Sequence, residues 1–441
     1  MTASLTPLDW SALPDSDRAE LLRRPAQRDA AGLSDKAGRI VADVRARGDA
    51  ALREYTERLD GVQLKSFAVS DAEFVAAEAA LTAEQHAALR RAIETVTRFH
   101  ETQSLDPLRV QTSPGVTCER LIVPLQAVGL YVPAGTAPLP STAIMLAVPA
   151  RIAGCPVRVM CTPPRPDGNA DPAVLVAARL CGVEQVFKLG GAQAVAAMAY
   201  GTASVPKVDK IFGPGNSWVT AAKQIVAADA DGAALDMPAG PSEVLVVADE
   251  SARPAFVAAD LLAQAEHSED AQVVLVTVSQ ALARACIAEV DRQLATLPRR
   301  AIAAKSIASS RVIVVPDVAT AIDVSNRYAP EHLILQVRAP RDWLPRVRNA
   351  GSVFLGAWTP ETMGDYCSGT NHVLPTYGHA RAYSGLGVLD FVKRMTVQEV
   401  TPDGLADLGL TARTLARLES LDAHANAVTV RLDALARGDR S

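Results

Sequence analysis

Short apolar runs alternate with helix-length segments over most of residues 120–355, and this alternation constrains the fold more than any other feature of the sequence. A first run predicts strands at 157–161, 185–189 and 208–212, with helices near 142–153, 171–181, 191–200 and 217–229. A second run predicts strands at 244–247, 272–276, 312–315, 333–336 and 353–355, with helices near 254–267, 279–294, 317–327 and 340–348. Alternation of this kind is typical of parallel sheets that are covered by helices on both faces.

The break between the two runs predicts the domain organisation. We expect an α/β fold with two doubly wound, Rossmann-like units, preceded by an N-terminal arm at 1–26. The first α/β domain is expected to combine 27–130 with 244–386, and the second to cover 131–243. The alternation stops near residue 387, and a helical stretch at 410–436 predicts a tail, 387–441, that packs on a partner subunit. Ligands of doubly wound sheets bind at the carboxyl ends of strands, so functional residues are expected in the loops that follow them.

Charge and hydropathy exclude several classes of protein. The 441 residues include 44 Lys and Arg against 49 Asp and Glu, without a long basic run, so no nucleic-acid partner is expected. Residues 121–150 are uncharged, but five prolines interrupt them, which predicts a strand, a loop and a buried helix rather than a membrane span. The N-terminal sequence lacks the basic and apolar segments of a secretory signal. We therefore expect a cytoplasmic protein without membrane contact.

The six cysteines do not form a recognisable framework. None of them belongs to a Cys-x-x-Cys pair, which argues against the simplest zinc-finger and thioredoxin motifs. Free thiols in a reducing compartment are expected.

The loop at 213–216, with the sequence GPGN, lies between a predicted strand and a predicted helix. This position suits a helix N-terminus that faces phosphate or ribose, although a tight structural turn explains the same residues. Gly-x-Gly-x-x-Gly and Walker A motifs are both absent from the sequence.

Two further segments combine groups that bind metals or transfer protons. Gln264 and His267 share one helix face, which suits two ligands of one metal ion or an ordinary surface pair. Glu331 and His332 are adjacent between a helix and a strand, where an acid and a base would transfer protons.

The polar, glycine-rich loop at 359–376 offers Asp365 and His372 as candidate ligands. In the tail helix, Glu419 and His424 either approach one site from opposite edges or belong to a solvated face.

These segments, in this order, resemble the histidinol dehydrogenase family over roughly residues 30–430. The resemblance is carried by YVPAGTAPLPST (131–142), KLGGAQA (188–194), KIFGPGN (210–216), DMPAGPSEVLV (236–246), DLLAQAEHS (260–268), YAPEHL (328–333), GSVFLG (351–356), GDYCSGTNHVLPT (364–376), AYSGLGV (382–388) and AHANAV (423–428). The sequence departs from the usual family motifs at Ala134, at Trp218 and in the long segment 163–172. None of these departures removes a proposed functional residue.

The resemblance implies a zinc enzyme that oxidises L-histidinol to L-histidine through bound L-histidinaldehyde, with two NAD, as the last step of histidine biosynthesis. It implies one zinc ion per subunit and an intertwined homodimer whose tail reaches the neighbour's site. The implied residues are Gln264, His267, Asp365 and His424 at zinc, Glu331 and His332 as the acid/base pair, Tyr131, Gln193 and Asn216 at NAD, and Ser242, His372 and Glu419 at the substrate. The zinc ligands and His332 would also contact the substrate. Nitrogen and oxygen ligands of this kind suit zinc, although glutamine is an uncommon zinc ligand.

Three alternatives stay open at this point. A relative in the same superfamily would oxidise another alcohol, such as a sulfonated diol, and would need added positive charge near Ser242, His372 and Glu419. A zinc hydrolase would need an open zinc position for water and no NAD. A binding or assembly protein would bind zinc without turnover.

Overall fold

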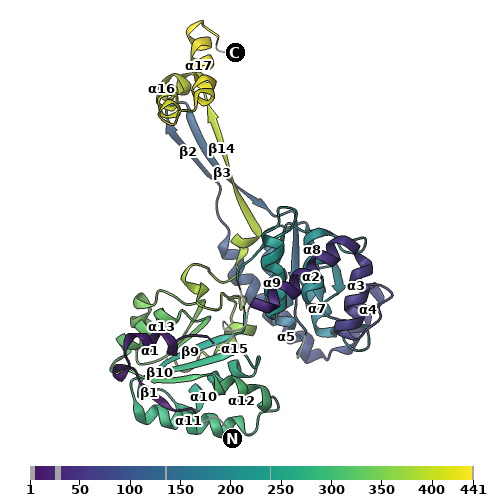
Figure 1. Ribbon diagram of the computed structural model, residues 1–441, viewed down its shortest axis with the longest axis vertical. Coiled ribbons are helices and arrows are strands. Elements are labelled where there is room, and N and C mark those ends of the chain that lie inside the picture. The colour runs from purple at the N-terminus through teal and green to yellow at the C-terminus, as the bar shows by residue number, and fades with distance from the viewer. Residues whose placement is uncertain (1–4, 25–30, 135–136, 239, 440–441) are drawn as a thin grey trace. The chain divides into compact units, whose positions relative to one another are not determined.

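The computed structural model describes residues 5–24, 31–134, 137–238 and 240–439, which divide into two compact units. One unit comprises Met1–Gln103 with Leu125–Phe391, and the other comprises Ser104–Pro124 with Val392–Ser441 (Figure 1). The larger unit contains two parallel sheets with helices on both faces, which confirms the predicted α/β class. Among the described residues, none of the helices combines the length and the apolar character that crossing a membrane requires.

The first parallel sheet has five strands in the order β6-β5-β4-β7-β8. Its strands are β4 (Ala127–Tyr131), β5 (Val157–Thr162), β6 (Gln185–Lys188), β7 (Lys210–Phe212) and β8 (Ala234–Leu235). Its crossover helices are α6 (Pro140–Ile152), α7 (Pro172–Leu180), α8 (Gly191–Tyr200) and α9 (Ser217–Ala227). The chain runs outward from β4 to β6 and then returns to place β7 on the other side of β4. The strand order therefore reverses at β4, the kind of point at which doubly wound sheets bind ligands.

Four N-terminal helices pack on the crossover helices of this five-stranded sheet. They are α2 (Ala31–Arg47), α3 (Asp49–Tyr55), α4 (Asp71–Ala80) and α5 (Ala83–His100). Val44 and Leu52 are buried with residues of α8 and α9, and Phe74 and Val96 are buried with residues of α6 and α7. This packing differs from the expected boundaries, which group 27–130 with 244–386. The reason is that the apolar faces of these helices meet the crossover helices of the five-stranded sheet.

The second parallel sheet has six strands in the order β1-β11-β10-β9-β12-β13. They are β1 (Pro7–Asp9), β9 (Glu243–Ala248), β10 (Gln272–Thr277), β11 (Arg311–Val314), β12 (His332–Gln336) and β13 (Ser352–Leu355). Helices α10 (Pro254–Ala265), α11 (Gln280–Leu294) and α12 (Arg300–Ala308) cover one face, and α13 (Val318–Tyr328) packs on the other (Figure 1). The expected N-terminal arm supplies the edge strand β1 and the buried Trp10 of this sheet.

The smaller unit is an antiparallel sheet with two helices. Its strands β2 (Leu108–Ser113), β3 (Val116–Pro124) and β14 (Val392–Val400) lie in the order β14-β3-β2. The prediction of one tail helix over 410–436 is wrong, because α16 (Pro402–Leu418) and α17 (Asp422–Ala436) are separate helices. Ser420 lies between them with a left-handed φ of 60°, which an α-helix does not accommodate.

Candidate active site

The predicted acid/base pair lies at the amino ends of β9 and β12. Glu331 precedes β12 and His332 is its first residue, and the two side chains are only 8% and 4% exposed. The backbone N–H of Glu243, which begins β9, donates to Glu331 Oε2 at 2.8 Å. His332 Nδ1 lies 3.0 Å from the carbonyl oxygen of Glu243. The start of one strand therefore holds both members of the pair.

The contact with Glu243 fixes the tautomer of His332. A carbonyl oxygen only accepts, so Nδ1 carries the hydrogen in this contact. Nε2 is buried and has no hydrogen-bond partner among the described residues; its nearest charged neighbour is Asp365, whose Oδ1 is 3.5 Å away. The neutral form of His332 presents an acceptor lone pair on the side where Asp365 lies, whereas the protonated form presents a second N–H to that carboxylate.

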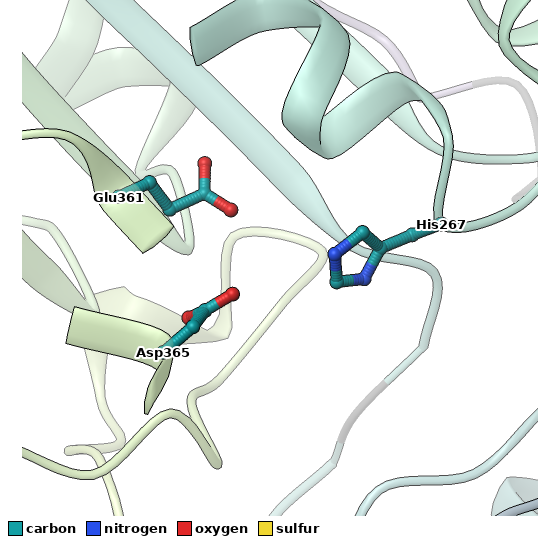
Figure 2. A group of neighbouring side chains, drawn as sticks. All are labelled: His267, Glu361 and Asp365. Atoms are coloured by element: carbon teal, nitrogen blue, oxygen red, sulfur yellow. The ribbon is translucent and has the colours of Figure 1, made fainter. Parts of the chain in front are cut away.

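Three side chains that could hold a metal ion, His267, Glu361 and Asp365, lie beside His332 and are called the metal-type group. One ligand atom each of His267, Glu361 and Asp365 lies within 4.8 Å of the others, and Figure 2 shows the three side chains converging. His267 follows the end of α10, and the two carboxylates come from α15 (Glu361–Tyr366). Glu361 was not identified as a candidate ligand from the sequence. Its i, i+4 spacing from Asp365, which places both side chains on one helix face, was the available signal.

Buried charge dominates the electrostatics of this group. Burial raises the pKa of Glu331 to about 8. Burial alone would lower the pKa of His332, but Glu361, Glu331 and Asp365 outweigh it and raise that pKa well above its usual value. Burial also raises the pKa of Glu361. Several acidic side chains around one imidazole make a site that favours a bound cation.

Gln264 and Ser242 lie beside the metal-type group. Gln264 is fully buried, and with its amide nitrogen towards Glu361 it donates to that carboxylate, 3.0 Å from Oε2. Its oxygen then accepts from Ser242 Oγ and from the backbone N–H of Glu243, both at 3.3 Å. The structure therefore brings these two predicted residues together with His267 and Asp365.

His372 is held by two contacts. Its Nδ1 donates to the backbone carbonyl of Asp365 at 2.8 Å, and its Nε2 lies 3.1 Å from the hydroxyl of Thr142. This predicted substrate residue therefore also fixes the backbone at Asp365. Glu419 and His424 belong to the smaller unit, where both are exposed, and their roles stay predictions.

A buried ion pair supports the start of β9, and sequence reasoning missed it. Arg24 Nε and Nη2 donate to the two oxygens of Glu243 at 2.5 and 2.8 Å. The guanidinium also lies 3.9 Å from the ring centroid of Tyr328. The pair couples the N-terminal arm to the residue that orients Glu331 and His332.

The three predicted NAD residues lie at the carboxyl edge of the five-stranded sheet. Tyr131 ends β4, and its hydroxyl accepts from the backbone N–H of Gly191 at 3.0 Å. Gln193 lies in the first turn of α8 after β6. Asn216 caps α9 after β7 by accepting from the backbone N–H groups of Trp218 and Val219 at 3.1 and 3.2 Å. This edge follows the expectation for doubly wound sheets, whereas the acid/base pair lies at the opposite, amino edge of its own sheet.

The fold and the site together define a class of α/β protein with two doubly wound parallel sheets, a buried Glu–His pair and a group of side chains that could hold a metal ion. Comparisons with known proteins narrow this class. The profile of the histidinol dehydrogenase family matches residues 22–432, and the chain belongs to this family. It is an oxidoreductase of histidine biosynthesis, which favours dehydrogenation over the hydrolase and assembly alternatives.

Individual relatives are similar to this chain over nearly its whole length. Histidinol dehydrogenase of Xanthomonas campestris pv. campestris is 58% identical over 425 residues, covering 96% of this chain and 98% of the relative. The enzyme of Vibrio parahaemolyticus is 53% identical and covers 97% and 98%. The crystal structure of histidinol dehydrogenase from Elizabethkingia anophelis superposes with a TM-score of 0.93 at 43% identity, covering 98% of both chains.

Proposed function

We propose that this chain oxidises L-histidinol to L-histidine through L-histidinaldehyde, with two NAD consumed and one zinc ion per subunit. The observation that carries this proposal is the arrangement of His332, whose Nδ1 is held by Glu243 and whose Nε2 is buried without a hydrogen-bond partner. In its neutral form, an imidazole held in this way is suited to remove the hydroxyl proton of an alcohol. A cation bound by Glu361 and Asp365 would offset the negative charge that raises the pKa of His332 and would so favour that neutral form. His332 is the proposed base of the first oxidation.

The donor set of the metal-type group fits zinc. An imidazole from His267 and the carboxylate of Asp365 are ligands that zinc prefers, and Gln264 lies beside them. Gln264, His267, Asp365 and His424 are the proposed ligands, with Glu361 as a further oxygen donor on the same helix face as Asp365. A bound zinc ion would orient the substrate and stabilise negative charge on its oxygen.

The carboxyl edge of the five-stranded sheet fits a dinucleotide. Tyr131 ends β4, while Gln193 and Asn216 follow β6 and β7, so all three lie near the switch point at β4. Bound there, NAD would accept the hydride in each oxidation. Glu331 is the proposed activator of the water that adds to the aldehyde, and His332 again takes a proton. Ser242, His372 and Glu419 are proposed to contact the substrate.

Removing one proposed ligand is expected to release the metal. We expect His267→Ala and Asp365→Asn to weaken zinc binding by more than the roughly 10–100-fold typical of a lost outer-shell partner. Zinc retained after dialysis against a graded chelator measures this. His86→Ala, at a half-buried histidine of α5, is the matched control and should retain zinc as the parent does. Full retention in both ligand variants would contradict the site.

We also propose a homodimer with shared sites. The smaller unit leaves several large apolar side chains exposed, among them Leu415 and Leu418, as a surface that packs on a second copy would. His424 and Glu419 would then serve the other subunit. Mixed dimers of His424→Ala and Glu331→Ala subunits are expected to regain activity that neither variant has alone. Absence of recovery in verified mixed dimers would place His424 in its own subunit's site.

We infer a cytoplasmic location for the enzyme. The six cysteines are free thiols, as expected from the sequence, and a biosynthetic oxidoreductase without disulfides suits a reducing compartment.

A further inference from the structure

Asp60 lies beyond the carboxyl end of strand β6. It ends the π-helical turn Thr56–Asp60, and Gly61 reverses the chain with a left-handed φ of 71°. The following segment runs antiparallel to β6, since Ala68 bridges Phe187 and the N–H of Lys188 donates to the carbonyl of Phe67 at 2.8 Å. The turn is therefore held at the same sheet edge as the three proposed NAD residues.

The contact between Asp60 and Gln193 leaves acceptor oxygens of both side chains without a hydrogen-bond donor among the described residues. Gln193 Nε2 donates to Asp60 Oδ2 at 3.4 Å, and Asp60 lies close enough to Tyr131 to raise the pKa of its phenol, although burial has the larger effect. Gln193 is only 1% exposed, yet its Oε1 has no hydrogen-bond partner within the described ranges. A buried amide oxygen without a partner is costly, so it indicates a site that a ligand with a donor completes.

No positive side chain offsets the charge of Asp60 in the described part of the chain, where its one hydrogen bond comes from the amide of Gln193. Burial accordingly raises its pKa to about 6, so the carboxyl is mainly ionised at neutral pH. A half-buried carboxylate with free acceptor positions suits a pair of neutral hydroxyl donors. The same charge repels a phosphate group placed beside it.

We propose that Asp60 selects the cofactor, because its carboxylate accepts hydrogen bonds from the vicinal hydroxyls of a ribose of the dinucleotide and excludes a 2′-phosphorylated ribose. The proposal rests on the proposed function, since it requires that a dinucleotide binds at this edge. Gln193 Oε1 accepts a further hydrogen bond from the same ligand. Asp60 thereby adds a fourth residue to Tyr131, Gln193 and Asn216.

Calorimetric titration of NAD and NADP into the full-length protein, without histidinol, tests this inference. The variants are Asp60→Asn, which removes the charge and keeps the shape, and Glu57→Gln, which removes an exposed charge from the same turn. Hydrogen bonds to charged groups are the stronger ones, so we expect Asp60→Asn to weaken NAD binding about tenfold or more. NADP binding should improve relative to NAD in this variant, and Glu57→Gln should keep the parent preference.

The outcomes separate the inference from the function on which it rests. If Asp60→Asn leaves the ratio of the NADP and NAD dissociation constants unchanged, Asp60 only positions Gln193 and the inference fails, whether or not both affinities fall. If the parent protein binds neither dinucleotide, the proposed NAD function itself fails. Thermal unfolding at pH 8 checks the fold, and Asp60→Asn should be at least as stable as the parent because a buried negative charge is removed.

Discussion

Replacing His332 with asparagine is expected to lower kcat for histidinol oxidation by about 10²–10⁴-fold, the usual contribution of a general base. The asparagine amide can donate to the Glu243 carbonyl as Nδ1 does, 3.0 Å away in the parent. The variant therefore removes the Nε2 lone pair while it keeps the contact that positions the side chain. Steady-state kinetics with zinc-loaded protein measures the effect.

Two comparisons show whether the loss comes from the base. His86→Asn changes a half-buried histidine of α5, outside the candidate site, and should keep the parent kcat. His332→Gln places an amide nearer the Nε2 position, but an amide does not take up the proton of an alcohol, so this variant should be as slow as His332→Asn. A decrease of less than tenfold in His332→Asn, with zinc retained, would contradict the role of His332.

Replacing Arg24 with methionine is expected to reduce the free energy of unfolding by about 3–5 kcal/mol, as is typical when one partner of a buried ion pair is lost. The Glu243 carboxylate would then keep the backbone N–H of Tyr377 as a donor but lose its charged partner. Because Glu243 also orients Glu331 and His332, we expect kcat to fall in the folded variant. Denaturant unfolding and kinetics on the same preparation measure both effects.

A double variant identifies the cause of this destabilisation. Arg24→Met with Glu243→Gln leaves no charge in the pair, and it should regain much of the stability that Arg24→Met loses. The coupling between the two substitutions measures the interaction directly. If the double variant is less stable than Arg24→Met alone, the unpaired charge is not the source of the loss.

The parallel sheets were predictable because each strand and helix has a local pattern. The strands expected at 244–247 and 272–276 are β9 and β10, each within one residue of its predicted ends. The antiparallel sheet of the smaller unit was not predicted, because its register joins Pro124 to Val392 across most of the chain. Its strands also lack a clean alternation, so local periodicity offered no signal.

In the candidate site, too, the features that are local in the sequence were predictable and the contacts between distant residues were not. Glu331 and His332 are adjacent in the sequence and stay together in the structure, whereas Arg24 and Glu243 are 219 positions apart. The placement of the pair at amino ends of strands also departs from the expected carboxyl edge. Here the first residue of β9, Glu243, supplies the backbone N–H and C=O that hold the pair, and β12 begins with His332 itself. Strand patterns in the sequence do not reveal this role.

Counting the NADH formed from limiting L-histidinol and excess NAD tests the central claim most directly. With zinc-loaded protein we predict two NADH per histidinol, histidine as the product, and loss of turnover when a chelator removes the metal. One NADH with released aldehyde would contradict the proposed role of Glu331 in the second oxidation. Formation of no NADH would contradict histidinol as the substrate and favour another alcohol, such as a sulfonated diol.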